Sequence, residues 1–152
     1  MIAKVYLREV KMIRNFINSE LDSVMKLWLK TNIEAHSFID ENYWRVNYET
    51  VKKMMPKATI LVYEDKGLIL GFIGLMNSYI AGIFIDSDSQ SKGIGKLLLD
   101  CVKESNSELS LSVYKKNDRA VDFYLKEGFA PINEQIDENT NETELIMQWK
   151  KQ

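Results

Sequence analysis

The sequence predicts a mixed α/β fold, a central and mostly antiparallel sheet of about seven strands flanked by about four helices. Short apolar runs and alternating segments read as strands, whereas longer segments with apolar residues every three or four positions read as amphipathic helices. Turn residues and helix-capping residues separate these segments. The chain of 152 residues has the length of one domain, so we expect residues 1–152 to bury a single core.

The N-terminal third reads as one strand followed by two helices. Residues 12–17 form the first predicted strand, and residues 1–11 alternate imperfectly, which leaves either an upstream extension or an extra edge strand. Ser19 and Glu20 resemble the start of a capping box for the first helix, and Pro56 ends the second. The apolar helix positions are Leu21, Val24, Met25, Trp28 and Leu29, then Trp44, Tyr48, Val51 and Met55.

Strand signals dominate the rest of the chain. The turn sequence Asp65-Lys66-Gly67 joins two of these strands as a hairpin. Further helices are expected after residues 79–85 and after residues 109–113. The predicted strands beyond the second helix are 59–63, 68–76, 79–85, 109–113, 129–136 and 144–149. The resulting order of elements is β-αα-βββ-α-β-α-ββ.

The segment Gln90-Ser91-Lys92-Gly93-Ile94-Gly95-Lys96 carries the strongest functional signal. It lies between a predicted strand and a helix with the apolar face Ile94, Leu97, Leu98, Cys101 and Val102. Free N–H groups at the helix start, the helix dipole and two flanking lysines favour an anionic group, and glycine removes the Cβ that would block it. The segment predicts a phosphate site; a tight turn without a ligand is the alternative.

Two common phosphate motifs do not fit this segment. A Walker-type loop needs Ser or Thr after Gly-Lys, and Leu97 stands there. A dinucleotide fingerprint needs a third glycine at the position of Leu98. The remaining pattern, Gln-x-x-Gly-x-Gly, resembles the pyrophosphate-binding signature of the GNAT superfamily of N-acetyltransferases.

A second segment strengthens this resemblance. In residues 117–129, Asn117 or Asp118 suits the N-cap of a helix and Gly128 suits its C-terminal end. The pattern Asn…Ala…Phe-Tyr…Gly-Phe in this segment resembles the second hallmark of the same superfamily. The two hallmarks cover roughly the C-terminal half of the chain, and the order of elements is that of the GNAT fold.

The resemblance implies acetyl-CoA as the acetyl donor and CoA as a product. Residues 83–85 would pair with the pantetheine arm where one strand splays from the next, and residues 90–96 would hold the pyrophosphate. Lys115, Lys116 and Arg119 either contact the 3′-phosphate or merely decorate a solvated helix start. The implied coenzyme-binding residues are Ile83, Phe84, Ile85, Gln90, Ser91, Lys92, Gly93, Ile94, Gly95, Lys96, Asn117 and Tyr124.

Tyr124 is the catalytic residue that the resemblance implies. The family places a tyrosine there to protonate the departing thiolate, and a phenol with a pKa of about 10 keeps its proton at neutral pH. The alternative is a packing role on the helix face that Val121 and Leu125 share. Asn117 matches the family asparagine that reaches the coenzyme near the thioester.

The acceptor site is expected between the first two helices, around His36, the only histidine. The predicted substrate-binding residues are His36, Phe38, Trp44 and Tyr79, with Tyr43 as a further aromatic; core packing is the alternative. The general base is either His36 or a water chain to a backbone carbonyl or a carboxylate. The segment 134–144, with five acidic and no basic residues, either attracts a cationic amine or forms a solvated hairpin.

Composition excludes several other classes of protein. With 45% hydrophobic and 28% charged residues and a formal charge of −2, the chain suits neither nucleic acid nor an anionic membrane surface. The lone Cys101 forms no intrachain disulfide, fits a reducing cytoplasm and lies on an apolar helix face, where packing is expected rather than nucleophilic catalysis. No metal site is expected, and both a monomer and a homodimer remain open.

The leading hypothesis is an N-acetyltransferase that moves acetyl from acetyl-CoA to a primary amine in a ternary complex. His36-Ser37-Phe38 and Tyr43-Trp44 resemble small single-domain bacterial acetyltransferases that modify protein lysines, so a protein lysine is the expected acceptor. Two alternatives remain. One is acetylation of a small amine, such as a polyamine, an aminoglycoside or an amino acid, and the other is a non-catalytic CoA-binding sensor on the same fold.

Overall fold

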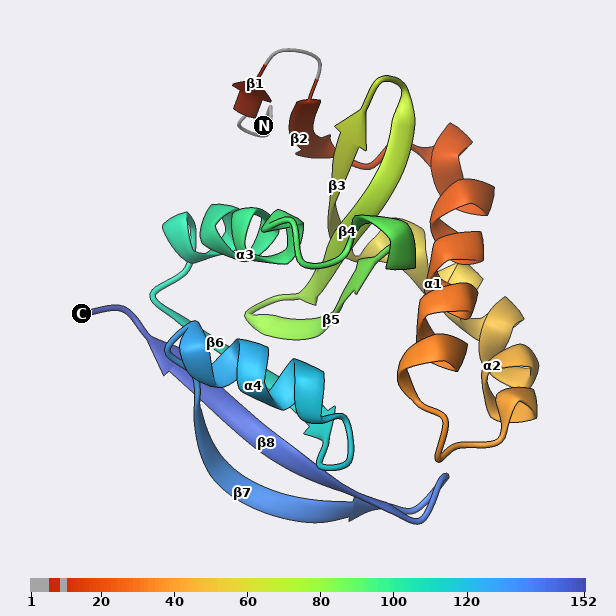
Figure 1. The fold of residues 1–152 in the computed structure, drawn as a ribbon, viewed down its shortest axis with the longest axis vertical. Helices are drawn as coiled ribbons and strands as arrows, with labels where there is room; N and C mark the ends of the chain where they lie inside the picture. The colour runs from red at the N-terminus through yellow and green to blue at the C-terminus, as the bar shows by residue number, and fades with distance from the viewer. Residues whose placement is uncertain (1–5, 9–10) are drawn as a thin grey trace.

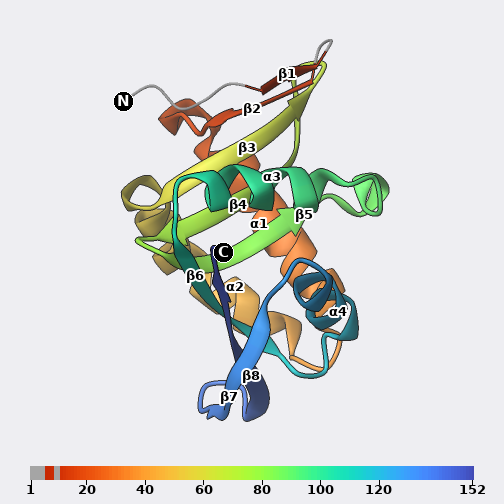
Figure 2. The same cartoon turned by 90° about the vertical axis from the view of Figure 1, so that its left-hand side faces the viewer.

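The computed structural model describes residues 6–8 and 11–152, which form an eight-stranded sheet with helices on both faces (Figures 1 and 2). The order of strands across the sheet is β1-β2-β3-β4-β5-β6-β8-β7. The strands are β1 Tyr6–Arg8, β2 Lys11–Asn15, β3 Thr59–Asp65, β4 Leu68–Met76, β5 Tyr79–Ile85, β6 Glu108–Tyr114, β7 Ala130–Asp137 and β8 Glu142–Lys150. The helices are α1 Leu21–Ala35, α2 Glu41–Met54, α3 Ile94–Glu104 and α4 Asp118–Lys126.

This arrangement confirms the mixed, mostly antiparallel sheet, the four helices and the predicted order of elements. The sheet has one strand more than the seven expected, because residues 6–8 form β1 and pair with β2 as an edge strand. The remaining residues of the 1–11 segment, apart from Lys11 at the start of β2, lie outside the described residues. Of the two alternatives for this segment, an upstream extension or an extra edge strand, the edge strand is confirmed for residues 6–8 alone.

One pair of neighbouring strands positions the functional site. All described strand pairs are antiparallel except β5 and β6, which run parallel and pair only through Tyr79 with Ser110 and Ile80 with Leu111. Beyond these two pairs the strands diverge toward their C-terminal ends. Because α3 follows β5 and α4 follows β6, both helices begin at this open end of the sheet (Figure 1).

The sheet buries an apolar core on each face. On one face α3 and α4 cover a cluster that includes the β6 residues Leu109, Leu111 and Val113. The residues that alternate with them in β6 are less buried, so the predicted alternation is confirmed. On the other face α1 and α2 pack Trp28 and Trp44 against β3 and β4. Figure 2 shows α3 in front of the sheet and α1 behind it.

The start of α1 differs from the expected capping box. The helix begins at Leu21 after a 3-10 turn, Asn18–Glu20, and its N-cap residue makes no side-chain hydrogen bond. The Glu20 carboxylate instead accepts from the Ile17 N–H at 3.1 Å. Ser19 therefore has no capping role, because the chain has already turned at residue 18.

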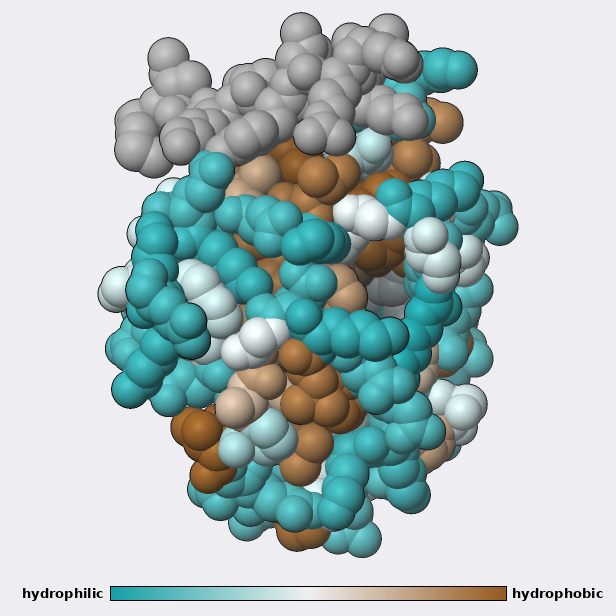
Figure 3. All heavy atoms as spheres, turned by 60° about the vertical axis from the view of Figure 1, so that its left-hand side comes forward, coloured by the Kyte–Doolittle hydropathy of each residue, from teal (hydrophilic) through white to brown (hydrophobic). Residues whose placement is uncertain are grey.

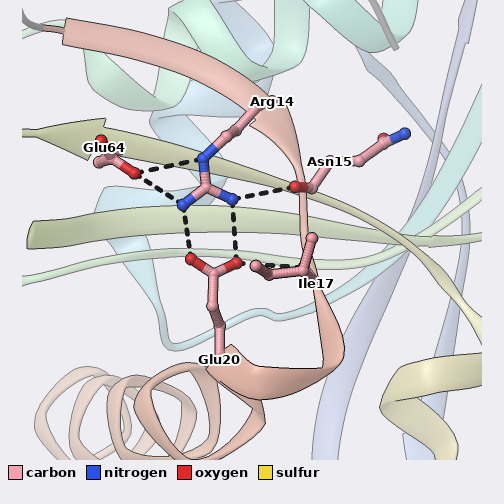
Figure 4. Close-up of polar contacts among 5 residues, drawn as sticks. All are labelled: Arg14, Asn15, Ile17, Glu20 and Glu64. Carbon is pink, nitrogen blue, oxygen red and sulfur yellow. Dashed lines mark hydrogen bonds and ion pairs between the residues drawn. The ribbon is translucent and has the colours of Figure 1, made fainter. Parts of the chain in front are cut away.

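The carboxylate of Glu20 belongs to an ion-pair cluster that joins β2, β3 and this turn (Figure 4). The Arg14 guanidinium donates to Glu20 at 2.9 Å and to Glu64 at 2.6 Å. It also donates to the backbone carbonyl of Asn15. The hydrogen bond from Arg14 holds the pKa of the Glu20 carboxyl below its usual range and raises that of Arg14.

Candidate functional site

A pocket of about 720 Å³ opens where β5 and β6 diverge. Residues of α1, α2, β5, the glycine turn, α3, β6 and α4 line it. A hollow with hydrophobic atoms at its margin lies between hydrophilic ridges on the face drawn in Figure 3. The predicted site residues in the lining are His36, Trp44, Ile83, Phe84, Ile85, Gln90, Ser91, Gly93, Ile94, Gly95, Lys96, Asn117 and Tyr124.

Three predicted site residues, Lys92, Phe38 and Tyr79, are absent from the pocket lining. Lys92 is exposed on the turn, between two residues with left-handed backbone. Phe38 contacts the edge of the His36 ring instead, at 5.7 Å between centroids. Tyr79 stands at the first position of β5, where it forms one of the two pairs that join β5 to β6, and is 41% exposed. Their predicted roles in binding remain predictions.

The glycine turn has the geometry of an anion cradle. Gly93 adopts φ +83° and caps α3, and an ideal Cβ built there meets no heavy atom within 4 Å. Ser91 also has a left-handed backbone, with φ 65°. The first N–H groups of α3 have no partner within the helix, so a phosphate can approach them over open space. The turn therefore fits the phosphate that the residues predict and the pyrophosphate that the family resemblance implies.

Lys96 contributes less charge to the cradle than expected. Its ammonium pairs with Glu127 at 3.2 Å and with Asp100 at 3.3 Å. These carboxylates, Glu127 first, raise the pKa of Lys96. The lysine lines the pocket but its charge is largely balanced within the protein.

Arg119 reaches the glycine turn from α4. From the first turn of α4 it donates hydrogen bonds to the side-chain oxygens of Gln90 and Ser91, the latter at 2.8 Å. Gln90 in turn donates to the Ile85 carbonyl at 3.0 Å. These hydrogen bonds connect the turn to α4 through Arg119 and to the end of β5 through Gln90.

Neither Lys115 nor Lys116 has a comparable contact with the turn. Lys115 pairs with Glu134 at 2.8 Å, and Lys116 pairs with Glu142 at 3.0 Å. Both lysines thus neutralise part of the acidic hairpin between β7 and β8. These ion pairs make it less favourable for the two lysines to bind the 3′-phosphate. They also reduce the negative charge with which the hairpin would attract a cationic amine.

Strand β5 turns alternate backbone groups toward the open edge. The Asp86 N–H donates to Leu70 of β4, and Ile85 accepts from Gln90 on the other side. By the two-residue alternation of an antiparallel ladder, Phe84 also faces β4, whereas Ile83 faces the pocket. Both backbone groups of Ile83 and the N–H of Ile85 are therefore open to an extended ligand, whereas the Ile85 carbonyl already accepts from Gln90. The backbone of Phe84 pairs with β4, and this residue contributes only its side chain to the lining.

The sequence did not predict a bulge in β5. Gly74 pairs with Gly82 and Leu75 with Ile80, which leaves Ala81 without a partner in β4. Ala81 lines the pocket, so its unpaired backbone groups lie beside the open edge. A glycine within a strand, here Gly82, is the sequence feature that could have indicated the bulge. In the structure, a Cβ at this position would lie 2.4 Å from the Phe84 ring.

Tyr124 lines the pocket from a buried position on α4, with 7% of its surface exposed. Its ring packs edge-on against Phe123 and Phe129. Burial raises the pKa of the phenol above its ordinary value. The hydroxyl therefore keeps its proton at neutral pH and can donate it.

His36 occupies an aromatic box on the α1 side of the pocket. Its ring stacks on Trp44 at 5.1 Å between centroids and meets Tyr114 edge-on at 5.3 Å. Its Nδ1 lies 2.9 Å from the Asn32 carbonyl oxygen, and its Nε2 lies 3.3 Å from Asn117 Nδ2. Burial lowers the pKa of His36, so the imidazole is neutral at pH 7.

Sequence reasoning missed several residues on this side, including Tyr114. It is the last residue of β6, and its hydroxyl donates to Asp137 at 2.6 Å. The alternation in strand 109–113 could have indicated this residue. The odd-numbered residues there are buried in the core, so Tyr114 falls on the opposite face of the sheet. Trp28, Thr31 and Asn32 of α1 also line the pocket.

Residues 33–148 match the family model of the acetyltransferase (GNAT) domain. The chain belongs to the GNAT acetyltransferase family. It is therefore an acetyl-CoA-dependent N-acetyltransferase, which confirms the resemblance and the enzyme class inferred from the sequence. Among the described residues there is no cluster of metal-ligating side chains and no helix long and apolar enough to cross a membrane.

Known GNAT proteins are similar along nearly the whole chain. Peptidyl-lysine N-acetyltransferase YiaC of Escherichia coli strain K12 is 34% identical over 140 residues, 91% of this chain and 96% of YiaC. The solution structure of apo-form YjaB from Escherichia coli has a TM-score of 0.82 at 24% identity and covers 94% of this chain and 99% of that chain.

A third similar structure is that of PaiA N-acetyltransferase from Thermoplasma acidophilum in complex with coenzyme A. It has a TM-score of 0.73 at 20% identity and covers 92% of this chain and 98% of that chain. At such identities the YjaB and PaiA structures establish a shared fold alone.

Proposed function

We propose that the protein acetylates the side chain of a protein lysine, by direct transfer from acetyl-CoA in a ternary complex. The observation that carries this proposal is the continuous pocket that runs from the glycine turn, past Tyr124, to an uncharged aromatic end at His36 and Trp44. The 34% identity to a peptidyl-lysine N-acetyltransferase over 91% of the chain supports the choice of acceptor.

The coenzyme side of this proposal rests on the cradle and the open strand edge. The N–H groups at the start of α3 and the Gly93 turn would hold the pyrophosphate, braced by Arg119 through Gln90 and Ser91. The backbone groups of Ile83 and the N–H of Ile85 would pair with the pantetheine arm, while the Ile85 carbonyl stays bonded to Gln90. When bound there, acetyl-CoA supplies an activated acetyl thioester.

Tyr124 is the proposed general acid. Its buried hydroxyl holds a proton at Oη up to a pH above the ordinary tyrosine range, because burial raises its pKa. That proton is available to the sulfur that departs from the acetyl group. Cys101 lies on the apolar face of α3 and does not line the pocket, so it is not placed to form an acyl-enzyme intermediate. This position favours direct transfer to the amine.

The charges of the lining favour a lysine side chain over a polyamine. The charged lining residues, Lys96, Arg119, Asp122 and Lys126, all belong to α3 or α4, on the coenzyme side. The described lining residues of α1, α2 and β6 include no carboxylate. A polyamine carries several charges that need acidic partners, whereas a lysine brings one amine on an aliphatic stem that suits aromatic walls.

An acceptor panel tests this proposal. Purified protein is incubated with acetyl-CoA and with lysine peptides, spermidine, an aminoglycoside or free amino acids, and CoA release is measured together with acetylation by mass spectrometry. The matched control peptide carries arginine in place of lysine. We expect CoA release with the lysine peptides and none with the arginine control.

The other outcomes separate the alternatives. A higher kcat/KM for spermidine or another small amine than for every lysine peptide would make this a small-molecule acetyltransferase. Tight binding of acetyl-CoA without turnover on any amine would make it a CoA sensor. The cytoplasmic location, the oligomeric state and the organisation as one domain remain predictions of the sequence.

A further inference from the structure

Two residues that are 81 positions apart in the sequence meet where β5 and β6 diverge. His36 is the C-cap of α1, and Asn117 is the N-cap of α4. These helices pack on opposite faces of the sheet, so the contact joins the two faces through the pocket. The atoms in contact are His36 Nε2 and Asn117 Nδ2, at 3.3 Å.

Their hydrogen bonds allow only one protonation state of the histidine. The Asn117 amide is oriented by its Oδ1, which accepts from the Ala120 N–H at 3.2 Å, so the atom that faces His36 is the donor Nδ2. His36 Nε2 must therefore accept. Its Nδ1 lies 2.9 Å from the Asn32 carbonyl, which can only accept, so Nδ1 carries the proton.

The surroundings of His36 hold the ring in this orientation. Trp44 stacks on one side, and Tyr114 and Phe38 meet the ring edge-on. None of these three side chains is charged at neutral pH. Charged groups contact two of these rings: Asp137 accepts from the Tyr114 hydroxyl, and the Lys116 ammonium lies 5.8 Å from the Phe38 ring centre.

We infer that His36 is a positioning residue, which as a neutral Nδ1–H tautomer fixes the Asn117 amide between the coenzyme and acceptor sides, and that it is not the general base. A base needs a free lone pair, and the lone pair of His36 is engaged by Asn117. Protonation of Nε2 would set one N–H donor against another and break the link. The proposed role of Asn117 toward the coenzyme rests on the proposed function.

Nuclear magnetic resonance of the apo-protein tests the link independently of activity. Because His36 is the only histidine, ¹⁵N-histidine labelling gives one pair of ring signals to assign. We expect the Nδ1–H tautomer in the wild type and a histidine pKa below its usual value. The Nε2–H tautomer, or a free imidazole that exchanges between tautomers, would overturn the inference.

Two variants at position 117 sharpen this test. Asn117→Asp keeps an oxygen for the Ala120 N–H and places a carboxylate opposite Nε2, so the His36 pKa should rise and Nε2 should gain a proton. Asn117→Ser keeps a side-chain oxygen that can cap α4 but has neither an amide nor a carboxylate to face His36, and it serves as the control. An unchanged His36 pKa in Asn117→Asp, with a wild-type thermal midpoint, would show that the two side chains are not linked.

Kinetics of two His36 variants then separate positioning from base catalysis. His36→Phe keeps the ring stack but removes the acceptor, whereas His36→Gln retains an oxygen that can accept from Asn117. We expect His36→Phe to lose about tenfold in kcat/KM for acetyl-CoA, the worth of one hydrogen bond, and His36→Gln to recover most of it.

The pH profile decides between the two roles. If His36 only positions Asn117, the acidic limb of kcat/KM for the amine persists in His36→Gln. Loss of that limb in both variants, with equal loss of kcat, would identify His36 as the base. Failure of the proposed function would look different, since the apo-protein signals would stay as expected while no amine is acetylated.

Discussion

Tyr124 combines burial, a place in the pocket lining and a raised pKa in one side chain. Phe123 and Phe129 pack edge-on against its ring, and the residue lines the pocket that opens where β5 and β6 diverge. Tyr124 therefore packs in the core, as the alternative interpretation of the sequence expected, and also lies where a catalytic residue is needed. A buried phenol that lines a pocket serves both purposes, and a substitution must remove the hydroxyl without disturbing the ring.

Tyr124→Phe makes that change. We expect kcat to fall roughly 100-fold, within the range typical of a general acid, while the Kd for acetyl-CoA stays within about twofold of the wild type. Stopped-assay kinetics and calorimetric titration measure the two quantities. An unaltered kcat would remove Tyr124 from the mechanism.

The protonation of Tyr124 also predicts a pH dependence. The acid form acts, and burial raises its pKa, so the activity that depends on it is complete at neutral pH and is lost only as pH rises above the ordinary tyrosine value of 10.0. An alkaline limb in the kcat profile below that value would have to come from another group.

Gly93 sets the shape of the phosphate cradle through its left-handed backbone and its missing Cβ. Gly93→Asp places a negative charge where the pyrophosphate is expected, and the Kd for acetyl-CoA should rise by at least about 100-fold. Gly93→Asn is the matched control, because asparagine tolerates positive φ and adds similar bulk without charge. Equal affinities of the two variants would show that charge in the cradle is irrelevant.

At the scale of elements, the Arg119 side chain joins the first turn of α4 to the glycine turn. Arg119→Lys keeps the charge but loses the fork that reaches both Gln90 and Ser91, and Arg119→Met removes both charge and fork. If the contact braces the turn, both variants should bind CoA about five- to tenfold more weakly in calorimetric titration. Wild-type affinity in Arg119→Lys would mean that only the charge matters.

The Arg14 cluster joins β2, β3 and the turn before α1 (Figure 4). Arg14→Met leaves two partly buried carboxylates without their shared cation, so we expect a loss of about 2 kcal/mol in the free energy of unfolding. For a chain of this length the thermal midpoint should fall by about 4–8 °C. A midpoint within about 1–2 °C of the wild type, the size of a surface substitution, would show that the cluster is not stabilising.

The same cluster makes stability depend on pH. The folded-state pKa of Glu20 lies below its unfolded value, so its contribution is complete above the unfolded pKa of about 4.3 and is lost as pH falls through the folded value. Glu20→Gln should flatten the stability curve over this acidic range. An equally steep curve in that variant would assign the dependence to other carboxylates.

At the scale of the whole molecule, the ligand should tie the two sides of the divergence together and stabilise the fold. Acetyl-CoA or CoA at about 100 times Kd adds about 2.7 kcal/mol, a rise of roughly 5–10 °C in the thermal midpoint. ATP and NAD serve as controls in the same unfolding experiment. A rise with ATP or NAD, and none with CoA, would contradict the assignment of the glycine turn.

Local features of the sequence predicted the four helices and seven of the eight strands. The strands and helices follow from apolar periodicity, the hairpin from Asp65-Lys66-Gly67, and the end of α4 from Gly128, whose φ is 91°. The glycine turn and the Asn117 cap were likewise predictable, because their conformations depend on residues within a few positions of each other. For the same reason both hallmarks of the GNAT family could be recognised in the amino-acid sequence alone.

Contacts between distant segments were decided only by the tertiary structure. The partners of Lys115, Lys116 and Arg119 lie 19 to 29 positions away, so their roles could not be read from neighbouring residues. The bond between His36 and Asn117 depends on the divergence of β5 from β6, which brings two helix ends together across the sheet. Sequence determined which groups are present, and the packing of the sheet determined which of them meet.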